Sequence, residues 1–336
     1  MNVLILGGTT FFGRHLARML VERSHTVSLF TRGISAYDES LACTRYVGDR
    51  DGDLGALPRT GWDAVVDTSG YVPGIVAASC AHLAHAGRYV FTSSISVYDA
   101  SGAVIGDGLS PYVPRVANLA DDAPENYGPS KRGAEDVVRA VFDDRAIVIR
   151  PGLLVGPHDP TNRFTYWADR FAEGGEIAIP GPPDRFVQCI DIRDAAAFVI
   201  HVLEDERSGT YDLSGKPQTT TMGELATIAR ATFDVDARLT WIDESFLEAR
   251  GFTGWMDLPL WIGPSHGFPG FMNANVDRAL EHGLTLRPFA QTLADTRAWS
   301  QRSGPVVPSE TIAGISRERE RDLLAAWQND RNSKPN

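Results

Sequence analysis

The sequence predicts an α/β fold with a doubly wound parallel sheet, on three observations. Six short runs in the first 150 residues are apolar and rich in β-branched side chains, as expected for strands buried on both faces. Helical stretches separate these runs, and such alternation is typical of a parallel sheet. A glycine-rich turn joins the first run to the first helical stretch. Because ligands of such sheets bind at the carboxyl ends of the strands, we expect the functional site there.

The expected strands follow one another at residues 3–6, 26–30, 44–47, 64–67, 88–92 and 146–149. Between the first two, apolar residues recur at helical spacing and predict a βαβ unit: Phe12, Leu16, Met19 and Leu20. The connection 99–126 is rich in Gly, Pro and Asp, and loops of this length commonly form lids or binding loops. Beyond residue 150 the composition changes, since six of the seven tryptophans lie there.

Length, composition and charge limit the function classes. The chain has 336 residues, of which 43% are hydrophobic and 22% charged, as in an ordinary globular protein. It has no apolar run of 18 residues and no basic leader, so we expect no membrane span and a cytoplasmic location. A net charge of -11 without a basic stripe argues against nucleic acid and anionic membranes as partners. The three cysteines lack metal-ligand spacing, so no metal site is predicted.

The turn after the first strand, residues 7–13, reads Gly-Gly-Thr-Thr-Phe-Phe-Gly and opens the first helix. Amides at a helix N-terminus attract a pyrophosphate, and glycines let the backbone approach it. No Gly-Lys-Ser/Thr follows, which excludes an NTPase P-loop. A tight turn without a ligand is the alternative. We predict a dinucleotide site with contacts from Gly7, Thr9, Thr10, Phe11, Phe12 and Gly13.

The end of the second strand discriminates between the two nicotinamide dinucleotides. NAD sites usually place an acidic residue there to hold the ribose 2′-OH. Here the strand end contains Arg32 and no acid, while Asp38 and Glu39 lie well past it. Because Arg32 can pair with a 2′-phosphate, NADP is favoured over NAD; a solvated loop arginine is the alternative.

Tyr127 and Lys131 stand four residues apart, and the chain holds only three lysines against 29 arginines. Residues four apart share one face of a helix, so the ammonium can lie near the phenol. A nearby cation favours phenolate and lowers the tyrosine pKa, which makes a general acid/base. The alternative is a surface tyrosine beside an unrelated lysine. Pro129 fits the first turn of the expected helix, where a missing N–H costs nothing.

Taken in order, the loop, a serine-rich strand end and Tyr-x-x-x-Lys resemble the extended short-chain dehydrogenase/reductases, the NAD-dependent epimerase/dehydratase family. The loop is most similar to that of an atypical subgroup with Gly-Gly-Thr-x-Phe-x-Gly. The resemblance covers roughly residues 1–215 and rests further on the stretches 91–98, 150–157 and 190–194. It implies a Rossmann-type sheet with a smaller, mainly C-terminal substrate lobe.

The resemblance implies residue roles by position. Ser94 matches the serine that hydrogen-bonds the reacting oxygen, with Ser93 as the second candidate. Tyr127 matches the proton donor and acceptor, and Lys131 matches the lysine that binds the nicotinamide ribose and lowers the tyrosine pKa. Asp49 matches an adenine contact, for which a plain loop carboxylate is the alternative. The other implied cofactor contacts, beside Tyr127 and Lys131, are Arg50, Thr68, Ser69, Gly70 and Pro151.

Three departures from the family pattern bear on the substrate and the cofactor. Thr10 replaces the family's middle loop glycine, which keeps the backbone farther from a phosphate. Asp184, with Arg185 beside it, stands where sugar-nucleotide epimerases carry a diphosphate-binding arginine, so a nucleotide sugar is in doubt because a carboxylate repels a diphosphate. The dehydratases' Asp-Glu pair reads Ile95-Ser96 here, which disfavours dehydration.

We therefore expect an NAD(P)-dependent reductase or epimerase that acts at a secondary alcohol or ketone of a small metabolite, in bacterial specialised or sugar-type metabolism. The alternative is a catalytically silent NADP-binding sensor or scaffold. Residues 1–150, with part of 185–215, should bind the dinucleotide, and 151–336 the substrate. A monomer or homodimer is expected. His158 either touches the substrate or is a plain loop histidine. The aromatic residues beyond residue 150 either line the substrate pocket or belong to the core: Trp167, Trp241, Trp255, Trp261, Phe268 and Phe271.

Overall fold

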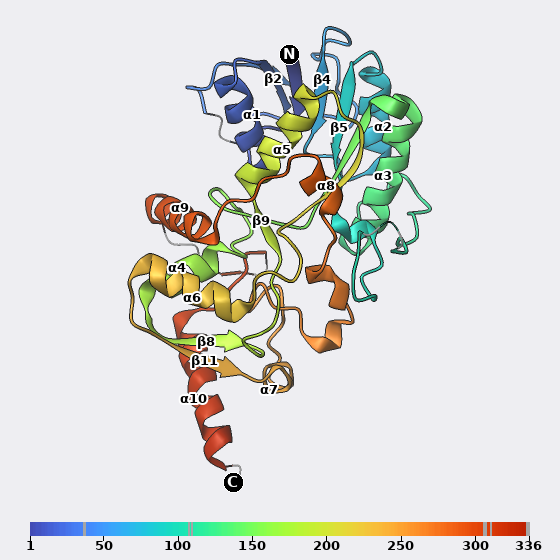
Figure 1. Ribbon diagram of the computed structural model, residues 1–336. Coiled ribbons are helices and arrows are strands. Elements are labelled where there is room, and N and C mark those ends of the chain that lie inside the picture. The colour runs from blue at the N-terminus through green and yellow to red at the C-terminus, as the bar shows by residue number, and fades with distance from the viewer. Residues whose placement is uncertain (36–37, 107, 109, 305–307, 310, 334–336) are drawn as a thin grey trace.

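The computed structural model describes residues 1–35, 38–106, 108, 110–304, 308–309 and 311–333, so Lys334 and two residues of the 99–126 connection lie outside the described residues. A parallel sheet occupies the upper half of Figure 1. Its seven strands are β1 (Asn2–Leu6), β2 (Thr26–Thr31), β3 (Cys43–Val47), β4 (Ala64–Asp67), β5 (Arg88–Thr92), β6 (Ala146–Pro151) and β10 (Gly209–Leu213). Their order is β10-β6-β5-β4-β1-β2-β3, and every neighbouring pair is parallel. The predicted doubly wound α/β sheet and its six expected strands are confirmed.

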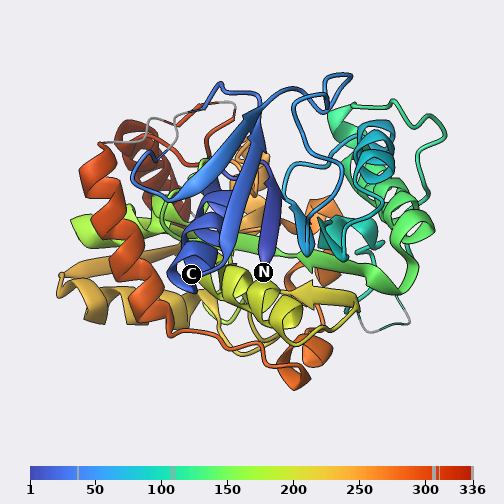
Figure 2. The same ribbon diagram turned by 90° about the horizontal axis from the view of Figure 1, so that it is seen from above.

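Helices cover both faces of this sheet, as the view from above in Figure 2 shows. One face packs against α1 (Phe11–Glu22) and α5 (Ile192–Glu204), and the other against α2 (Pro73–His82) and α3 (Tyr127–Phe142). Successive side chains of a strand point to opposite faces. In β1, Val3 and Ile5 accordingly join the core under α1 and α5, whereas Leu4 and Leu6 join the core under α2 and α3.

The sequence-distant strand β10 lies at the sheet edge beside β6, and the preceding helix α5 packs on α1. Residues after 150 thus return to the sheet, in the segment that sequence analysis expected to do so. The short strands β7 (Leu153–Val155) and β9 (Cys189–Asp191) pair in parallel where the chain leaves and re-enters the sheet. The exact domain boundary near residue 150 stays a prediction.

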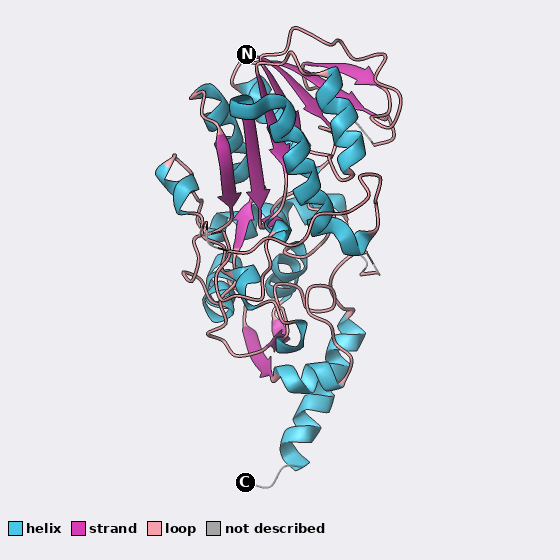
Figure 3. Cartoon of the chain, turned by 90° about the vertical axis from the view of Figure 1, so that its right-hand side faces the viewer, coloured by secondary structure: helices cyan, strands magenta, loops and turns pink. Residues whose placement is uncertain are grey.

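A second core lies below the sheet in Figures 1 and 3, and its residues come from the C-terminal half. The elements here are α4 (Thr165–Glu173), β8 (Gly175–Pro180), α6 (Met222–Phe233), β11 (Ala237–Ile242), α7 (Glu244–Ala249), α9 (Phe289–Ser303) and α10 (Arg317–Ser333). The short helix α8 (Asp277–Glu281) instead lies beside β10 and buries Ala279 in the core under α1 and α5. The C-terminal helix α10 buries Leu323, Leu324 and Trp327. Single 3-10 turns occur at Ile95–Val97, Pro124–Asn126, Asp143–Arg145, Pro264–His266 and Pro269–Met272. Within the described ranges, no helix is long and apolar enough to cross a membrane.

Candidate active site

The glycine loop between β1 and α1 lies at the carboxyl edge of the sheet. Gly7 and Gly8 adopt φ of +108° and +99°, a region that L side chains rarely adopt. A Cβ on Gly13 would lie 2.6 Å from the Gly8 backbone nitrogen, so only glycine lets the helix approach the loop this closely. Thr10 has extended backbone at φ -124° and its side chain does not cap α1. Threonine therefore fits at this position without strain, and the loop forms a cradle into which a pyrophosphate fits.

Two adjoining recesses extend from this loop, and Thr10 and Tyr71 line both. The larger, of about 640 Å³, is lined by Ser94, Tyr127, Lys131, Thr10, Phe11, Phe12, Gly13, Thr68 and Pro151, among others. The smaller, of about 340 Å³, is lined by Gly7, Thr9, Thr10, Arg32, Asp49, Arg50 and Ser69, among others. Of the predicted site residues, only Gly70 lines neither recess, and its carbonyl oxygen accepts a hydrogen bond from Lys131.

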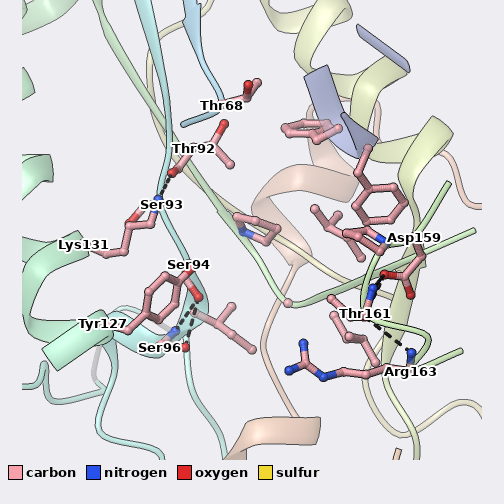
Figure 4. Close-up of a pocket in the computed structure, with 18 of the residues that line it drawn as sticks. Thr68, Thr92, Ser93, Ser94, Ser96, Tyr127, Lys131, Asp159, Thr161 and Arg163 are labelled. Carbon is pink, nitrogen blue, oxygen red and sulfur yellow. Dashed lines mark hydrogen bonds between the residues drawn. The ribbon is translucent and has the colours of Figure 1, made fainter. Parts of the chain in front are cut away.

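The two candidate serines at the end of β5 have different surroundings. The Ser93 hydroxyl donates to the buried Glu135 carboxylate at 2.5 Å, so it is held within the core. The Ser94 hydroxyl accepts from the Ser96 amide and donates to the Ser96 hydroxyl, both at 3.1 Å, within the larger recess. Figure 4 shows Tyr127 leaning toward Ser94. The geometry brings Ser94, and not Ser93, to the phenol.

Helix α3 begins at Tyr127, and the helical spacing brings Lys131 to the same side, as the sequence predicted. Lys131 is only 3% exposed. Its ammonium donates to the carbonyl oxygens of Gly70 at 2.7 Å and Thr92 at 2.8 Å. It also lies 4.6 Å from the ring centre of Tyr71 and 5.8 Å from that of Tyr127. The retained lysine is thus fixed at the floor of the recess by two strand-end carbonyls.

The expected direction of the Tyr127 pKa is wrong for this structure. Burial raises the pKa of Tyr127 to about 12, and a hydrogen bond with Ser94 and the charge of Arg163 only partly oppose this. Burial also lowers the pKa of Lys131 from its ordinary 10.5 to about 8, although the Asp67 carboxylate raises it. Lys131 is buried, and Tyr127, although 39% exposed, lines the recess, where loss of water disfavours the charged form of each group. Desolvation of the phenol therefore outweighs the attraction of an ammonium 5.8 Å from its ring centre.

A buried ion pair, which sequence reasoning missed, supports the turn after β4. Asp67 is fully buried and accepts two hydrogen bonds of 2.7 Å from Arg50 and one of 2.9 Å from the Tyr89 hydroxyl. Arg50 also donates to Ser69 and Ser79, both at 3.1 Å. The predicted cofactor residue Arg50 therefore has protein partners for its guanidinium and holds the turn that presents Gly70 to Lys131. The sequence offered one signal for this ion pair: Asp67 ends the apolar strand β4, and Arg50 follows β3.

Arg32 and Gly33 follow β2 directly and line the smaller recess with Ile34 and Ser35. Asp38, the nearest acid beyond the strand, instead pairs with Arg18 at 3.1 Å and Arg14 at 3.6 Å on α1. Asp49 is the one acidic residue among those that line this recess. At the end of β2, as the sequence led us to expect, the recess is thus lined by Arg32, while Asp38 is paired with arginines of α1.

The second lobe contributes the far wall of the larger recess, where Arg163 stacks on Trp255 and Phe271 meets Trp255 edge-on. Most of the other C-terminal aromatics lie elsewhere: Trp167 and Trp261 are buried, Trp241 packs against the same core, and Phe268 is 52% exposed. His158 contacts His15 and Trp299 outside the recess. Arg185 pairs with Glu244, also outside it. From the 99–126 connection, Pro124 reaches the recess.

Residues 72–213 match the model of the NAD dependent epimerase/dehydratase family. This segment belongs to that family. It contains the ends of β5 and β6, both candidate serines, Tyr127 and Lys131. The resemblance seen in the sequence is confirmed at this level, and the loop subgroup stays a prediction.

The chain is similar in sequence to a plant protein and in fold to several solved structures. The chain is 27% identical over 248 residues to the Arabidopsis thaliana chloroplast stem-loop binding protein of 41 kDa b; the match covers 68% of this chain and 63% of that relative, less than two thirds. The UDP-N-acetylglucosamine 4-epimerase of Bacillus cereus superposes with TM-score 0.65 at 18% identity, covering 91% of this chain and 98% of that one. The Bacillus cereus UDP-glucuronic acid 4-epimerase, solved with NAD, gives 0.63 at 14%, covering 90% and 99%. Human epimerase family protein SDR39U1, solved with NADPH, gives 0.59 at 19%, covering 89% and 99%.

Proposed function

We propose that this chain is a nicotinamide-dependent reductase or epimerase that acts at a secondary alcohol or ketone of a small metabolite. One observation carries the proposal: Ser94, Tyr127 and Lys131 converge in a recess that adjoins the one lined by the glycine loop. A hydroxyl, a phenol and an ammonium at that edge of the sheet are what proton transfer at a carbon–oxygen centre requires. A bound nicotinamide would accept or donate the hydride.

The chain's own residues would orient the reacting oxygen and move its proton. With a pKa raised to about 12, Tyr127 carries its proton at neutral pH and can donate it to a substrate oxygen as negative charge develops there. Ser94, whose hydroxyl faces the same space, would hold that oxygen by a second hydrogen bond. Lys131 would bind the nicotinamide ribose and relay charge to Tyr127. In the oxidative direction the same phenol must first lose its proton.

The glycine cradle, Arg32 and the smaller recess together support a dinucleotide, with NADP favoured over NAD. Arg32 lines the recess with no acid beside it at the end of β2, and Asp38 is engaged by Arg14 and Arg18. The similar folds solved with NAD and with NADPH agree with either dinucleotide. A cofactor that co-purifies and does not exchange would indicate an epimerase, which oxidises and re-reduces one carbon. Free exchange would indicate a net reductase.

A Tyr127→Phe variant tests the catalytic proposal, because it removes only the hydroxyl. NADPH and NADH titrations, followed by cofactor absorbance, should show binding in both proteins. Turnover of an alcohol and ketone panel should fall by a factor of about 10² or more in the variant. Unchanged turnover would contradict the role of Tyr127. Cofactor binding with no turnover by the wild-type protein would favour a silent sensor or scaffold.

The name of the Arabidopsis thaliana relative brings forward a second candidate, binding of a nucleic-acid stem-loop. The net charge of -11 weighs against it, because nucleic-acid affinity depends on basic surfaces that neutralise phosphates. A gel shift with a stem-loop RNA at physiological salt discriminates the two functions. A shift that survives 200 mM salt would favour binding over the enzymatic proposal.

A further inference from the structure

Arg163 lies across the larger recess from Tyr127, on the loop between β7 and α4. Figure 4 shows its guanidinium pointing over the recess toward the strand-end serines. The guanidinium carbon lies 4.6 Å from the ring centre of Trp255, whose own ring is held edge-on by Phe271 at 5.3 Å. Stacking on an aromatic face fixes the plane of a guanidinium and leaves its N–H groups directed outward along that plane.

No protein anion neutralises this guanidinium at close range. The Nε of Arg163 is buried without a hydrogen-bond partner, and no carboxylate of the described residues lies within 4.0 Å of the side chain's nitrogens. Asp159, which also lines the recess, is near enough to raise the Arg163 pKa but makes no ion pair with it. Its Oδ1 accepts from the Thr161 amide at 2.8 Å and the Thr161 hydroxyl at 2.7 Å, and its Oδ2 is buried without a hydrogen-bond partner. Burial lowers the pKa of Arg163 and is the larger effect. The charge is therefore held in the recess at a cost in free energy.

Arg163 is half-buried, and the fully buried arginines show how this chain pairs such a charge elsewhere. Arg50 pairs with Asp67 at 2.7 Å, Arg150 with Glu135 at 2.6 Å, and Arg170 with Glu320 at 2.7 Å. Arg163 departs from this pattern and lines the larger recess, which a ligand can enter. Lys131 already donates to two carbonyl oxygens, and its remaining N–H is the one proposed for the nicotinamide ribose. Arg32 lines the other recess.

We infer that Arg163 is a specificity-determining residue that binds an anionic group, a carboxylate or a phosphate, on the substrate of the proposed hydride-transfer site. Both anions match the planar fork of a guanidinium with two parallel hydrogen bonds. That the anion belongs to a substrate rests on the proposed function, whereas the anion site itself is inferred from the geometry of Arg163 and Trp255. The substrate class is then a small hydroxy or keto acid, or a phosphorylated alcohol, with its anion on the Arg163 side and its reacting oxygen on the Tyr127 side.

Anion titration of the full chain tests the inference without knowledge of the substrate. Calorimetric titrations with inorganic phosphate and with acetate are made on the protein saturated with NADPH or NADH, so that the cofactor's own phosphates fill the glycine cradle. We expect saturable binding of one probe to the wild-type protein. Arg163→Gln should weaken it about tenfold to a hundredfold, since hydrogen bonds to a charged group are lost. Arg163→Lys, which keeps the charge and loses the fork, should fall between the two.

Arg238→Gln is the matched control, because it removes an arginine whose side chain is 69% exposed and far from the recess. Phosphate binding in preference to acetate assigns a phosphorylated substrate, and the reverse assigns a carboxylate. Absence of saturable binding of either probe to the wild-type protein, or equal binding by wild type and Arg163→Gln, overturns the inference. Cofactor binding is measured in the same samples and tests the proposed function separately. If the wild-type protein binds neither NADPH nor NADH, the proposed function is refuted, whereas the comparison of anion binding between wild type and Arg163→Gln still holds.

Discussion

Burial of Lys131 should be visible as a pH-dependent stability that a Lys131→Met variant lacks. The lysine is 3% exposed, and its pKa is lowered from 10.5 to about 8, chiefly by burial. Methionine keeps the length of the side chain but carries no titrating group. The substitution also removes hydrogen bonds to the carbonyl oxygens of Gly70 and Thr92, which lowers stability by the same amount at every pH.

The sign and size of the pH dependence follow from the two pKa values. Between pH 8 and pH 10.5 the native protein releases the Lys131 proton while the unfolded chain keeps it, so the free energy of unfolding rises with pH. Below pH 8 both forms are protonated and the full cost of burying the ammonium is present. At 1.36 kcal/mol per pKa unit, the wild-type protein should gain about 2 kcal/mol from this one group between pH 7 and pH 9.5.

Urea unfolding, followed by tryptophan fluorescence, measures the free energy of unfolding of wild type and Lys131→Met at pH 7 and pH 9.5. The change between the two pH values in wild type, minus the same change in Lys131→Met, gives the contribution of Lys131. Other titrating groups cancel because both proteins carry them. Lys216→Met, which removes an exposed lysine, is the matched control and should show no comparable effect. The stability difference between wild type and Lys131→Met should change with pH. A change of less than about 0.5 kcal/mol between pH 7 and pH 9.5, the size usual for surface substitutions, would refute the lowered pKa of a buried Lys131.

Four further outcomes follow from the site and its supports. Asp67→Ala should lower the free energy of unfolding by about 3–5 kcal/mol in urea, because Arg50 is left buried and unpaired; the exposed Asp49→Ala should change it little. Ser94→Ala should lower kcat by about 10² while cofactor affinity is kept, whereas equal losses of both would place Ser94 in cofactor binding. Arg32→Ala should weaken NADPH about tenfold in fluorescence titrations and leave NADH unchanged; equal weakening contradicts the 2′-phosphate contact. Gly13→Ala should lower stability by about 1–3 kcal/mol, since its Cβ meets the Gly8 backbone at 2.6 Å, while Gly55→Ala, with only a contact at 3.7 Å, should not.

The sheet and the glycine loop were predictable because their causes are local. An apolar, β-branched run buried on both faces reads as a strand whatever surrounds it, and all six expected strands formed. The spacing of Tyr127 and Lys131 likewise specified their common helix face, since four residues span about one helical turn. The substitution of Thr10 for the family's glycine looked like a conflict from the sequence. The extended backbone accommodates threonine without strain, and the greater distance to a phosphate stays a prediction.

What failed depended on burial, which one sequence does not fix. A cation beside a tyrosine lowers the pKa of the phenol only where this attraction outweighs desolvation, and at Tyr127 desolvation is the larger effect. Arg50 lines the smaller recess and stays a predicted cofactor contact, but its buried carboxylate partner Asp67, from a different strand, was not foreseen. Nothing in the local sequence distinguishes Arg163, which lacks a partner, from arginines that have one. Only the folded structure shows which arginines have a carboxylate partner.

The pKa of Tyr127 connects the proposed chemistry to the proposed substrate. The Arg163 charge is one of two influences that lower this pKa, the other being a hydrogen bond with Ser94. An anion bound to Arg163 would cancel that charge, and the phenol would hold its proton more firmly. Binding a substrate acid would therefore keep Tyr127 protonated until a developing alkoxide pulls the proton away. Lys131, with a pKa of about 8, is the neighbouring group able to return a proton near physiological pH. Under the proposed hydride-transfer function, a phenol that keeps its proton favours donation to a ketone oxygen over removal of a proton from an alcohol.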